Sequence, residues 1–258
     1  MPSPSTEFEA QLELFRTESE SAIQFFYAWD ATHAVAGKNK SVVKLLNQAP
    51  LFWNTALGAL QASTFVALGR IFDPDQNNYS VTRLLALGHA NLDIFSKEAL
   101  AERKRKLSSN ADEWLPEYLK DVYLPKNEDF RRLKKHVAQR RKIYEQNYRP
   151  IRHMVIAHRA VTTRAEVSEL FANTNLRELR QLLVFLGRLY EALWQLYFNG
   201  HKPMLRPARF SVNRMLEQPS PSKKSGKVQE RLVNETSDFF KNQAQMPNPS
   251  LQRTASGS

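Results

Sequence analysis

Apolar side chains recur every three or four positions across residues 175–198, and this regular spacing constrains the fold more than any other feature of the sequence. The stripe consists of Leu179, Leu182, Leu183, Leu186, Leu189, Tyr190, Leu193, Leu196 and Tyr197. Such spacing places the side chains on one face of an α-helix, and Gly200 directly after it is typical of a helix C-terminus. The sequence therefore predicts a long helix that buries one face against other elements.

Helical spacing also appears in most of the chain upstream. It predicts helices at about residues 6–35, 41–72, 80–87 and 95–107, and a long basic helix from residue 127. Pro50 is expected to start or kink the second helix, Ser80 to cap the third helix, and Pro150 to kink the basic helix. Turns are expected at residues 73–78, Pro116 and Pro125. There are only 8 glycines, and the β-branched residues do not gather into alternating runs. These patterns predict an all-α fold.

The helical pattern fails after residue 200, where prolines, serines and basic residues dominate. This change predicts one helical domain over residues 5–200 and a Pro/Ser-rich, mostly disordered basic tail over residues 201–258. Within the tail, a short amphipathic helix near residues 228–240 is the one ordered element that the pattern allows.

The chain carries a formal net charge of +11, which indicates a polyanionic partner because phosphate neutralisation releases counterions. The alternative is that part of this charge lies in the tail and only aids solubility. The absence of cysteine excludes a disulfide framework, an iron–sulfur centre, a thiolate zinc site and a cysteine nucleophile. Because no other cluster of metal ligands has suitable spacing, we expect neither a metal nor another cofactor.

Two stretches bear on localisation. Residues 1–15 contain Glu7, Glu9 and Glu13 where a secretory signal requires a basic start and an apolar run, so a cytoplasmic protein is expected. Residues 45–69 contain no charged residue and are long enough to span a bilayer. Lipid would leave the several amide and hydroxyl side chains of this stretch poorly satisfied, which favours a buried helix of a soluble bundle and no membrane association.

The string Y-R-P-I-R-H-M-V-I-A-H-R at residues 148–159 is the candidate functional motif. In it, Arg152 is followed directly by His153, and His158 lies six positions after Arg152. This order resembles the motif of the HEPN superfamily (higher eukaryotes and prokaryotes nucleotide-binding domains). The string A-L-G-R-I-F-D at residues 67–73 narrows the resemblance to the abortive-infection U (AbiU-like) branch. The resemblance covers roughly residues 7–200, without accounting for an insertion at about residues 92–126.

The resemblance implies a HEPN-type antiparallel helical bundle with a helical insertion, and a metal-independent endoribonuclease that leaves a 2′,3′-cyclic phosphate. It also implies an abortive-infection or toxin-like role in antiviral defence, RNA as the partner, and a homodimer whose motifs meet across a cleft. An antitoxin or another partner protein that holds the chain silent is a further expectation. The alternative that remains open is a non-catalytic HEPN-like module that binds RNA or a partner protein.

The residues of the motif suit RNA cleavage without a metal. A histidine titrates near neutrality, so His158 is predicted to act as general acid/base on the ribose 2′-hydroxyl or the leaving 5′-oxygen. A guanidinium holds a phosphate in a fork, so Arg152 is predicted to bind the scissile phosphate. His153 is assigned as a polar helper, and Arg149 and Arg159 as weaker RNA contacts. The competing interpretation is structural, with His158 hydrogen-bonded inside the bundle and Arg152 in a surface ion pair.

Helix geometry limits what one motif can do alone. Residues six positions apart point about 120° away from each other on an ideal helix, so Arg152 and His158 do not share a face. A second protomer would supply the missing groups. A dense basic run lies upstream of the motif and comprises Arg131, Arg132, Lys134, Lys135, Arg140 and Arg141. These residues either guide RNA toward the motif or form an ordinary solvated helix face. Arg70 and Asp73 are interpreted as structural, in a salt bridge that anchors the motif helix or in turn chemistry.

Overall fold

The computed structural model describes residues 2–73, 79–153, 174–218 and 226–245. Across these ranges the chain forms helices and no strand, which confirms the predicted all-α class. The chain divides into two compact units: unit 1 comprises residues 1–22 and 65–210, and unit 2 comprises residues 23–64 and 211–258. Each unit has its own buried apolar residues, so each is described by itself.

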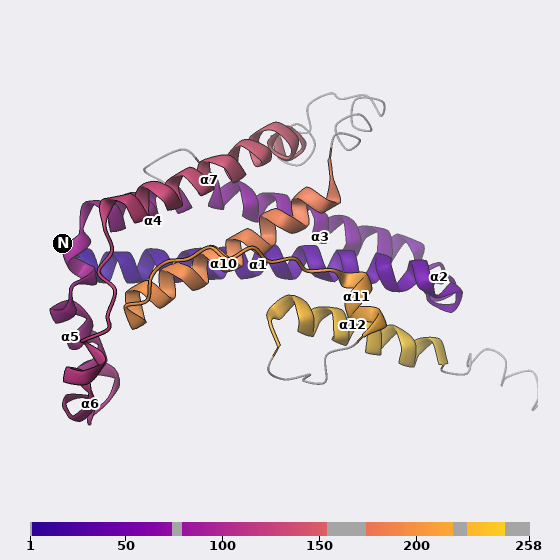
Figure 1. Ribbon diagram of the computed structural model, residues 1–258. Coiled ribbons are helices and arrows are strands. Elements are labelled where there is room, and N and C mark those ends of the chain that lie inside the picture. Colours follow the sequence, from indigo (N-terminus) through magenta and orange to yellow (C-terminus); the bar gives the residue numbers. More distant parts are fainter. Residues whose placement is uncertain (1, 74–78, 154–173, 219–225, 246–258) are drawn as a thin grey trace, which may run out of the picture. The chain divides into compact units, whose positions relative to one another are not determined.

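Unit 1 contains most of the helices labelled in Figure 1. It begins with the first part of α1 (Pro4–Lys38) and the last part of α3 (Pro50–Ile71). The helices that follow are α4 (Val81–Ala90), the 3-10 helix η1 (Leu92–Phe95), α5 (Lys97–Leu107), α6 (Ala111–Tyr118), α7 (Asn127–Asn147), α8 (Arg149–Ile151) and α10 (Leu176–Asn199). Helices α4 and α7 lie side by side, and α5 contacts α6 and α10.

Local sequence signals set several of the helix ends in unit 1. The side chain of Ser80 accepts a hydrogen bond from the backbone N–H of Arg83 at 3.3 Å and so caps α4, as the sequence predicts. Gly200 ends α10 in the left-handed conformation, with φ of 61°, and its N–H donates to the Leu196 carbonyl at 3.1 Å. Pro116 was expected to lie in a turn but lies inside α6.

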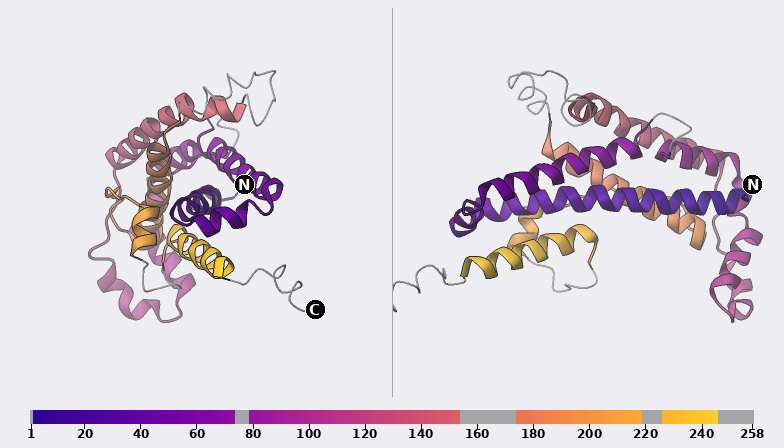
Figure 2. Two further views of the ribbon diagram at one scale, coloured as in Figure 1. Left: turned by 90° about the vertical axis from the view of Figure 1, so that its right-hand side faces the viewer. Right: turned by 180° about the vertical axis from the view of Figure 1, so that it is seen from behind.

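Aromatic rings from four elements form the core of unit 1 beside the insertion. Phe8 of α1 lies 5.2 Å from Phe95 and 5.1 Å from Tyr197, and Phe95 lies 5.6 Å from Phe130, measured between ring centroids. Arg103 of α5 is buried against this cluster, and its guanidinium lies 4.0 Å from the Tyr197 ring centroid. The predicted helical insertion at residues 92–126 thus consists of η1, α5 and α6, with α5 and α6 adjacent in both views of Figure 2.

The predicted single helix over residues 41–72 is two helices, α2 (Lys40–Leu46) and α3, and Pro50 is the first residue of α3. The prediction that this uncharged stretch is buried holds only for its C-terminal part. Phe65, Leu68 and Ile71 are buried, whereas Leu51 is 82% exposed. One described helix, α3, is long and apolar enough to cross a membrane by length and composition, and only 22% of its most apolar window is buried.

Unit 2 contains helices in the segment that composition predicts to be mostly disordered. After residue 210 the chain forms α11 (Val212–Glu217) and α12 (Val228–Gln245), which contact each other, and α12 also contacts α2. Phe240 is 2% exposed and packs with Val35 and Val42, with its ring 5.6 Å from Trp53. Helix α12 is therefore ordered by the packing of its apolar face, a contact that overall composition does not reveal.

Candidate functional site

The motif segment follows α7 after a break in the helix. Helix α7 ends at Asn147, Tyr148 is its C-cap, and the three-residue helix α8 begins at Arg149 with Pro150 in its first turn. This break matches the kink that the sequence predicts at Pro150. Arg152 and His153 continue as a short π-helical turn and end the part of the motif that the structure describes. Local widening of a helix of this kind is frequent at functional sites.

Two aromatic stacks hold this end of α7 against α3. The ring of Tyr144 stacks on Phe72 with centroids 5.6 Å apart and planes inclined by 22°. One turn later, the ring of Tyr148 stacks on Phe65 at 5.9 Å and 26°. Offset stacks of this kind add to the free energy of burial, and two in register fix the rotation of one helix against the other. The backbone that carries Arg152 is therefore held at a defined position beside α3.

Arg152 lies directly over Gly69 of α3. A Cβ atom added to Gly69 would lie 2.5 Å from Arg152 Nε and 2.7 Å from both Cδ and Cζ. Any other residue at position 69 would occupy the space that the guanidinium takes. The Arg152 side chain is half-buried there, and Gly69 is buried. The glycine in the A-L-G-R-I-F-D string thus has a specific role, because it lets the motif arginine cross the backbone of α3.

The Tyr144 hydroxyl lies beside this arginine. Burial raises the pKa of Tyr144, and the positive charge of Arg152 lowers it in part. Among the described residues, the buried hydroxyl has no hydrogen-bond partner of normal geometry. A neutral Tyr144 accordingly forms part of the wall around the guanidinium.

Two hydrogen bonds join the other side of the segment to α10. The Tyr148 hydroxyl donates to the Asn175 carbonyl at 2.9 Å, and Asn147 Nδ2 donates to Glu178 Oε2 at 3.0 Å. Asn175 also caps α10, since its side chain accepts from the N–H of Arg177 at 2.9 Å. The chain therefore enters and leaves residues 154–173 at two anchored points, Arg152 beside α3 and Asn175 beside Tyr148.

The structure places some of the predicted site residues and not others. Arg149 and His153 are exposed, and Arg152 is half-buried at Gly69. His158 and Arg159 lie outside the described residues. The predicted meeting of Arg152 with His158 therefore stays a prediction. Within the described residues, no group of three or more His, Asp or Glu side chains is placed to hold a metal ion.

Arg70, two positions before Phe72, has a structural partner, as the sequence analysis favoured. Its guanidinium forms an ion pair with Glu18 of α1 at 2.9 Å. The sequence predicts that such a salt bridge anchors the motif helix, but this ion pair joins α3 to α1 instead. The motif helix is held by Tyr144, Tyr148 and Asn147, whose roles the sequence analysis missed. The four-residue spacing of the two tyrosines, on one helical face directly ahead of the motif, was the available signal.

The basic run of α7 does not form one patch, because its side chains point in several directions. Several of its cations have a partner close by: Arg131 pairs with Glu128 at 3.5 Å, Arg132 with Asp129 at 2.8 Å and Arg141 with Glu145 at 2.8 Å, while Lys134 donates to His89 Nδ1 at 2.8 Å. Lys135 is exposed, and the Arg140 guanidinium lies 5.6 Å from the Phe185 ring centroid. Guidance of RNA by the whole run stays a prediction.

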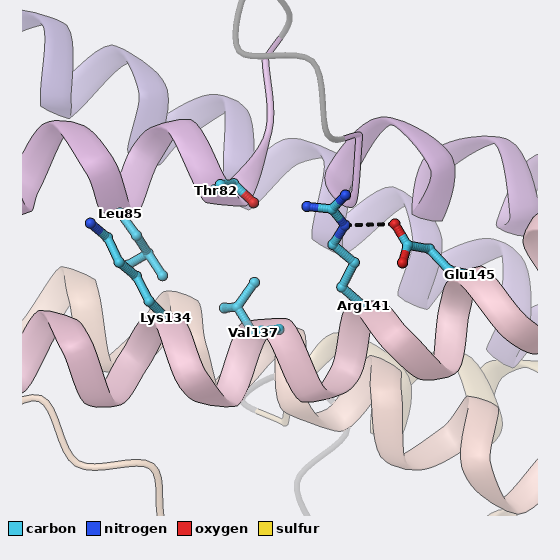
Figure 3. Close-up of a pocket in the computed structure, with 7 residues that line it drawn as sticks. Thr82, Leu85, Lys134, Val137, Arg141 and Glu145 are labelled. Atoms are coloured by element: carbon cyan, nitrogen blue, oxygen red, sulfur yellow. Dashed lines mark hydrogen bonds and ion pairs between the residues drawn. The ribbon is translucent and has the colours of Figure 1, made fainter.

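A groove of about 390 Å³ lies between α4 and α7 on one side of this run. Figure 3 shows Thr82 and Leu85 on α4 facing Lys134, Val137 and Arg141 on α7. Burial lowers the pKa of Lys134 here. The dashed line in Figure 3 marks the ion pair between Arg141 and Glu145, which neutralises the cation that points into the groove. This groove therefore offers little net charge to an anionic ligand.

Comparison with protein families identifies a match over most of the chain. The model of the HEPN AbiU2 family matches residues 5–218, which include the motif, the A-L-G-R-I-F-D string and α11. No curated protein and no solved structure matches the chain. The match confirms the resemblance that the two strings indicate, and it extends beyond residue 200, where the sequence analysis placed the end of the domain.

Proposed function

The chain belongs to the AbiU2 family of HEPN proteins, and from this premise we propose that it is a metal-independent endoribonuclease acting in phage defence or in a toxin–antitoxin-like response. The observation that carries the proposal is the placement of Arg152. Its guanidinium is set against Gly69 beside two aromatic stacks, at the end of the helix that leads into the motif. A cation held in place before the substrate arrives stabilises developing charge without the cost of reorganisation.

The proposed reaction is attack of a ribose 2′-oxygen on the adjacent phosphorus. His158 removes the proton of the 2′-hydroxyl as the new P–O bond forms, and the bond to the 5′-oxygen breaks as that oxygen receives a proton. Arg152 holds two phosphate oxygens and offsets their growing negative charge. His153 assists as a polar neighbour. The proton that His158 takes up is returned to the 5′-oxygen, so the products are a 2′,3′-cyclic phosphate and a 5′-hydroxyl. In the proposed dimer, His158 of one copy and Arg152 of the other act on the same phosphate.

The test is incubation of the purified protein with RNA in the presence of EDTA. Cleavage should persist without divalent metal, and the products should end in a 2′,3′-cyclic phosphate. His158→Ala and Arg152→Ala should each lower the rate by about 100-fold or more, because each removes a group that acts in the transition state. His201→Ala, a change at an exposed histidine after α10, is the control and should leave the rate unchanged. Full cleavage by both motif variants would refute the site.

A second candidate function is a non-catalytic module that binds RNA or a partner protein such as an antitoxin. The net charge of +11 favours it, since a strongly basic surface binds polyanions without any chemistry. The same assay separates the two functions. The binding module should retain RNA with a steep dependence on salt and release no product.

A further inference from the structure

A second groove flanks α7, on the side that faces α10. It has a volume of about 320 Å³ and is lined by α7, α10 and residues 205–209. The residues that matter most are His136 and Arg140 of α7, Phe185 and Arg188 of α10, and Arg206 and Arg209 of the segment that follows. Neither Asp nor Glu is among the lining residues. Four guanidiniums and one imidazole therefore face one half-open cavity.

The positive charge of this groove is not compensated within the described part of the chain. None of the ion pairs among the described residues involves Arg140, Arg188, Arg206 or Arg209. In the groove beside α4, by contrast, Glu145 neutralises Arg141. Like charges close together repel each other, and an anion that binds among them relieves this repulsion. The groove is thus suited to a ligand with several negative charges.

The groove presents guanidiniums and not an aromatic platform. Phe185 is only 9% exposed, and the guanidinium of Arg140 lies over its ring at 5.6 Å. A nucleobase has no free ring face to stack on there. Guanidiniums recognise phosphate oxygens through paired hydrogen bonds, and phosphate contacts carry no base sequence information. The ligand chemistry that fits is therefore a phosphate group, bound independently of sequence.

The cationic surface continues from the groove toward the motif. Arg188, Gln181 and Arg177 are spaced by seven and four residues, so they lie on the same face of α10. Arg188 and Arg177 are separated along the helix by roughly 16 Å, from the rise per residue. Arg177 adjoins Asn175, whose carbonyl accepts the hydrogen bond from Tyr148 of the motif segment. Two arginines separated by this distance are better suited to successive phosphates of one strand than to a single small anion.

We propose that this groove binds the phosphodiester backbone of the RNA strand a few nucleotides away from the bond that the motif cleaves. The inference rests on the proposed ribonuclease function for the identity of the strand. The groove then serves as a sequence-independent anchor, and the motif performs the chemistry.

The test uses an oligonucleotide of 2′-O-methyl RNA, which has no 2′-hydroxyl to attack and so reports binding alone. The variant carries Arg188→Gln, Arg206→Gln and Arg209→Gln, and leaves Arg140 in place because it covers Phe185. The control removes the same charge elsewhere in unit 1, at exposed cations that pair with nearby carboxylates: Arg105→Gln, Lys106→Gln and Lys120→Gln.

The groove variant should bind the oligonucleotide with an affinity lower by about tenfold or more. The slope of log affinity against log salt concentration should become less negative by about 2, because three phosphate contacts are lost. The control should bind within about twofold of the parent, since exposed paired cations contribute little. Equal weakening in both variants would reduce the effect to net charge and overturn the proposal. Unchanged binding by the groove variant would overturn it as well.

Two further experiments identify which phosphate compound binds in the groove and test this inference separately from the ribonuclease function. ATP and inorganic pyrophosphate are titrated in place of RNA, and binding of ATP that depends on the three arginines, with RNA binding unaffected, would overturn the RNA assignment. On cleavable RNA, the groove variant should show a raised KM with an unchanged kcat. If the parent chain releases no product and yet binds RNA through these arginines, the ribonuclease proposal fails while the backbone-binding site remains.

Discussion

Gly69 and Arg152 are far apart in the sequence, and the structure brings the guanidinium of one over the backbone of the other. Both belong to strings that the sequence analysis singled out, but the glycine had no assigned role there. A helix-interior glycine costs about 1 kcal/mol relative to alanine, so its place in α3 calls for a reason. The space that Arg152 occupies supplies that reason.

The pair leads to a prediction for Gly69→Ala. The new methyl group would displace the Arg152 side chain, which can move because it is long and flexible, so stability should change by no more than about 1 kcal/mol. Cleavage should fall about tenfold or more, because a shift of an ångström at a phosphate-binding group is costly to the rate. The measurements are the rate on RNA in EDTA and the free energy of unfolding in urea.

Gly58→Ala is the matched control for this change. Gly58 lies in the same helix, and a Cβ atom added there would meet no atom within 4 Å. This variant should gain about 0.5–1 kcal/mol of stability from helix propensity and retain the parent rate. Equal rates for both variants would show that Arg152 is not held by the space at Gly69.

At the scale of the elements, helix ends with local signals were predictable from sequence. Ser80, Pro50 and Gly200 each act within one turn of the chain, through a side-chain cap, a missing N–H or a left-handed conformation. Pro116 misled the prediction because α6 continues past it, with the N–H of Leu119 donating to the Leu115 carbonyl at 2.9 Å. One lost hydrogen bond near the end of a short helix is tolerable when Leu115 is buried.

Helix α12 shows why the segment after residue 210 was harder to predict. Its pattern predicted a helix near residues 228–240, but its composition favoured disorder. The difference comes from tertiary burial. Val233 and Phe240 are buried, and Phe240 contacts residues of α1, α2 and α3 that lie about 200 positions earlier in the sequence. Composition counts residues and carries no information about such distant partners.

Phe240→Ala tests this packing. Loss of a buried phenylalanine side chain costs about 3–5 kcal/mol through lost burial and the cavity that remains. We expect amides of α12 to exchange their hydrogens much faster in this variant, as measured by mass spectrometry. Phe239→Ala is the control at the adjacent position, since Phe239 is 51% exposed, and it should change stability by less than about 1 kcal/mol. Similar exchange in the two variants would mean that α12 is not stabilised by this contact.

At the scale of the whole molecule, the motif string was recognisable in the sequence, whereas the surfaces beside it were not. The groove beside α10 combines residues 136–140, 181–188 and 205–209, which no local pattern links. The basic run of α7 was treated as one patch, although consecutive helical residues point 100° apart. In the structure Lys134 and Arg141 line one groove, where Arg141 pairs with Glu145, and Arg140 lines another groove, which has no such ion pair among the described residues.

The proposed homodimer rests on the family resemblance and on the angle of about 120° that an ideal helix would place between Arg152 and His158. If one protomer supplies the guanidinium and the other the imidazole at a shared phosphate, neither Arg152→Ala nor His158→Ala should cleave RNA alone. When equal amounts of the two variants are mixed and exchange subunits, about half of the dimers combine one of each. Such a dimer retains one arginine and one histidine from opposite protomers, so cleavage should return well above the rate of either variant.

The mixing experiment is read together with the mass of the protein in solution. Light scattering should give twice the monomer mass of 29.8 kDa for the parent and for both variants. A mixture of two Arg152→Ala preparations with different tags controls for the exchange procedure and should stay inactive. A parent that is monomeric and still cleaves RNA would contradict the shared site. A dimeric parent whose mixed variants stay inactive would instead require both groups to come from the same protomer, because only then does each mixed dimer lack a complete pair.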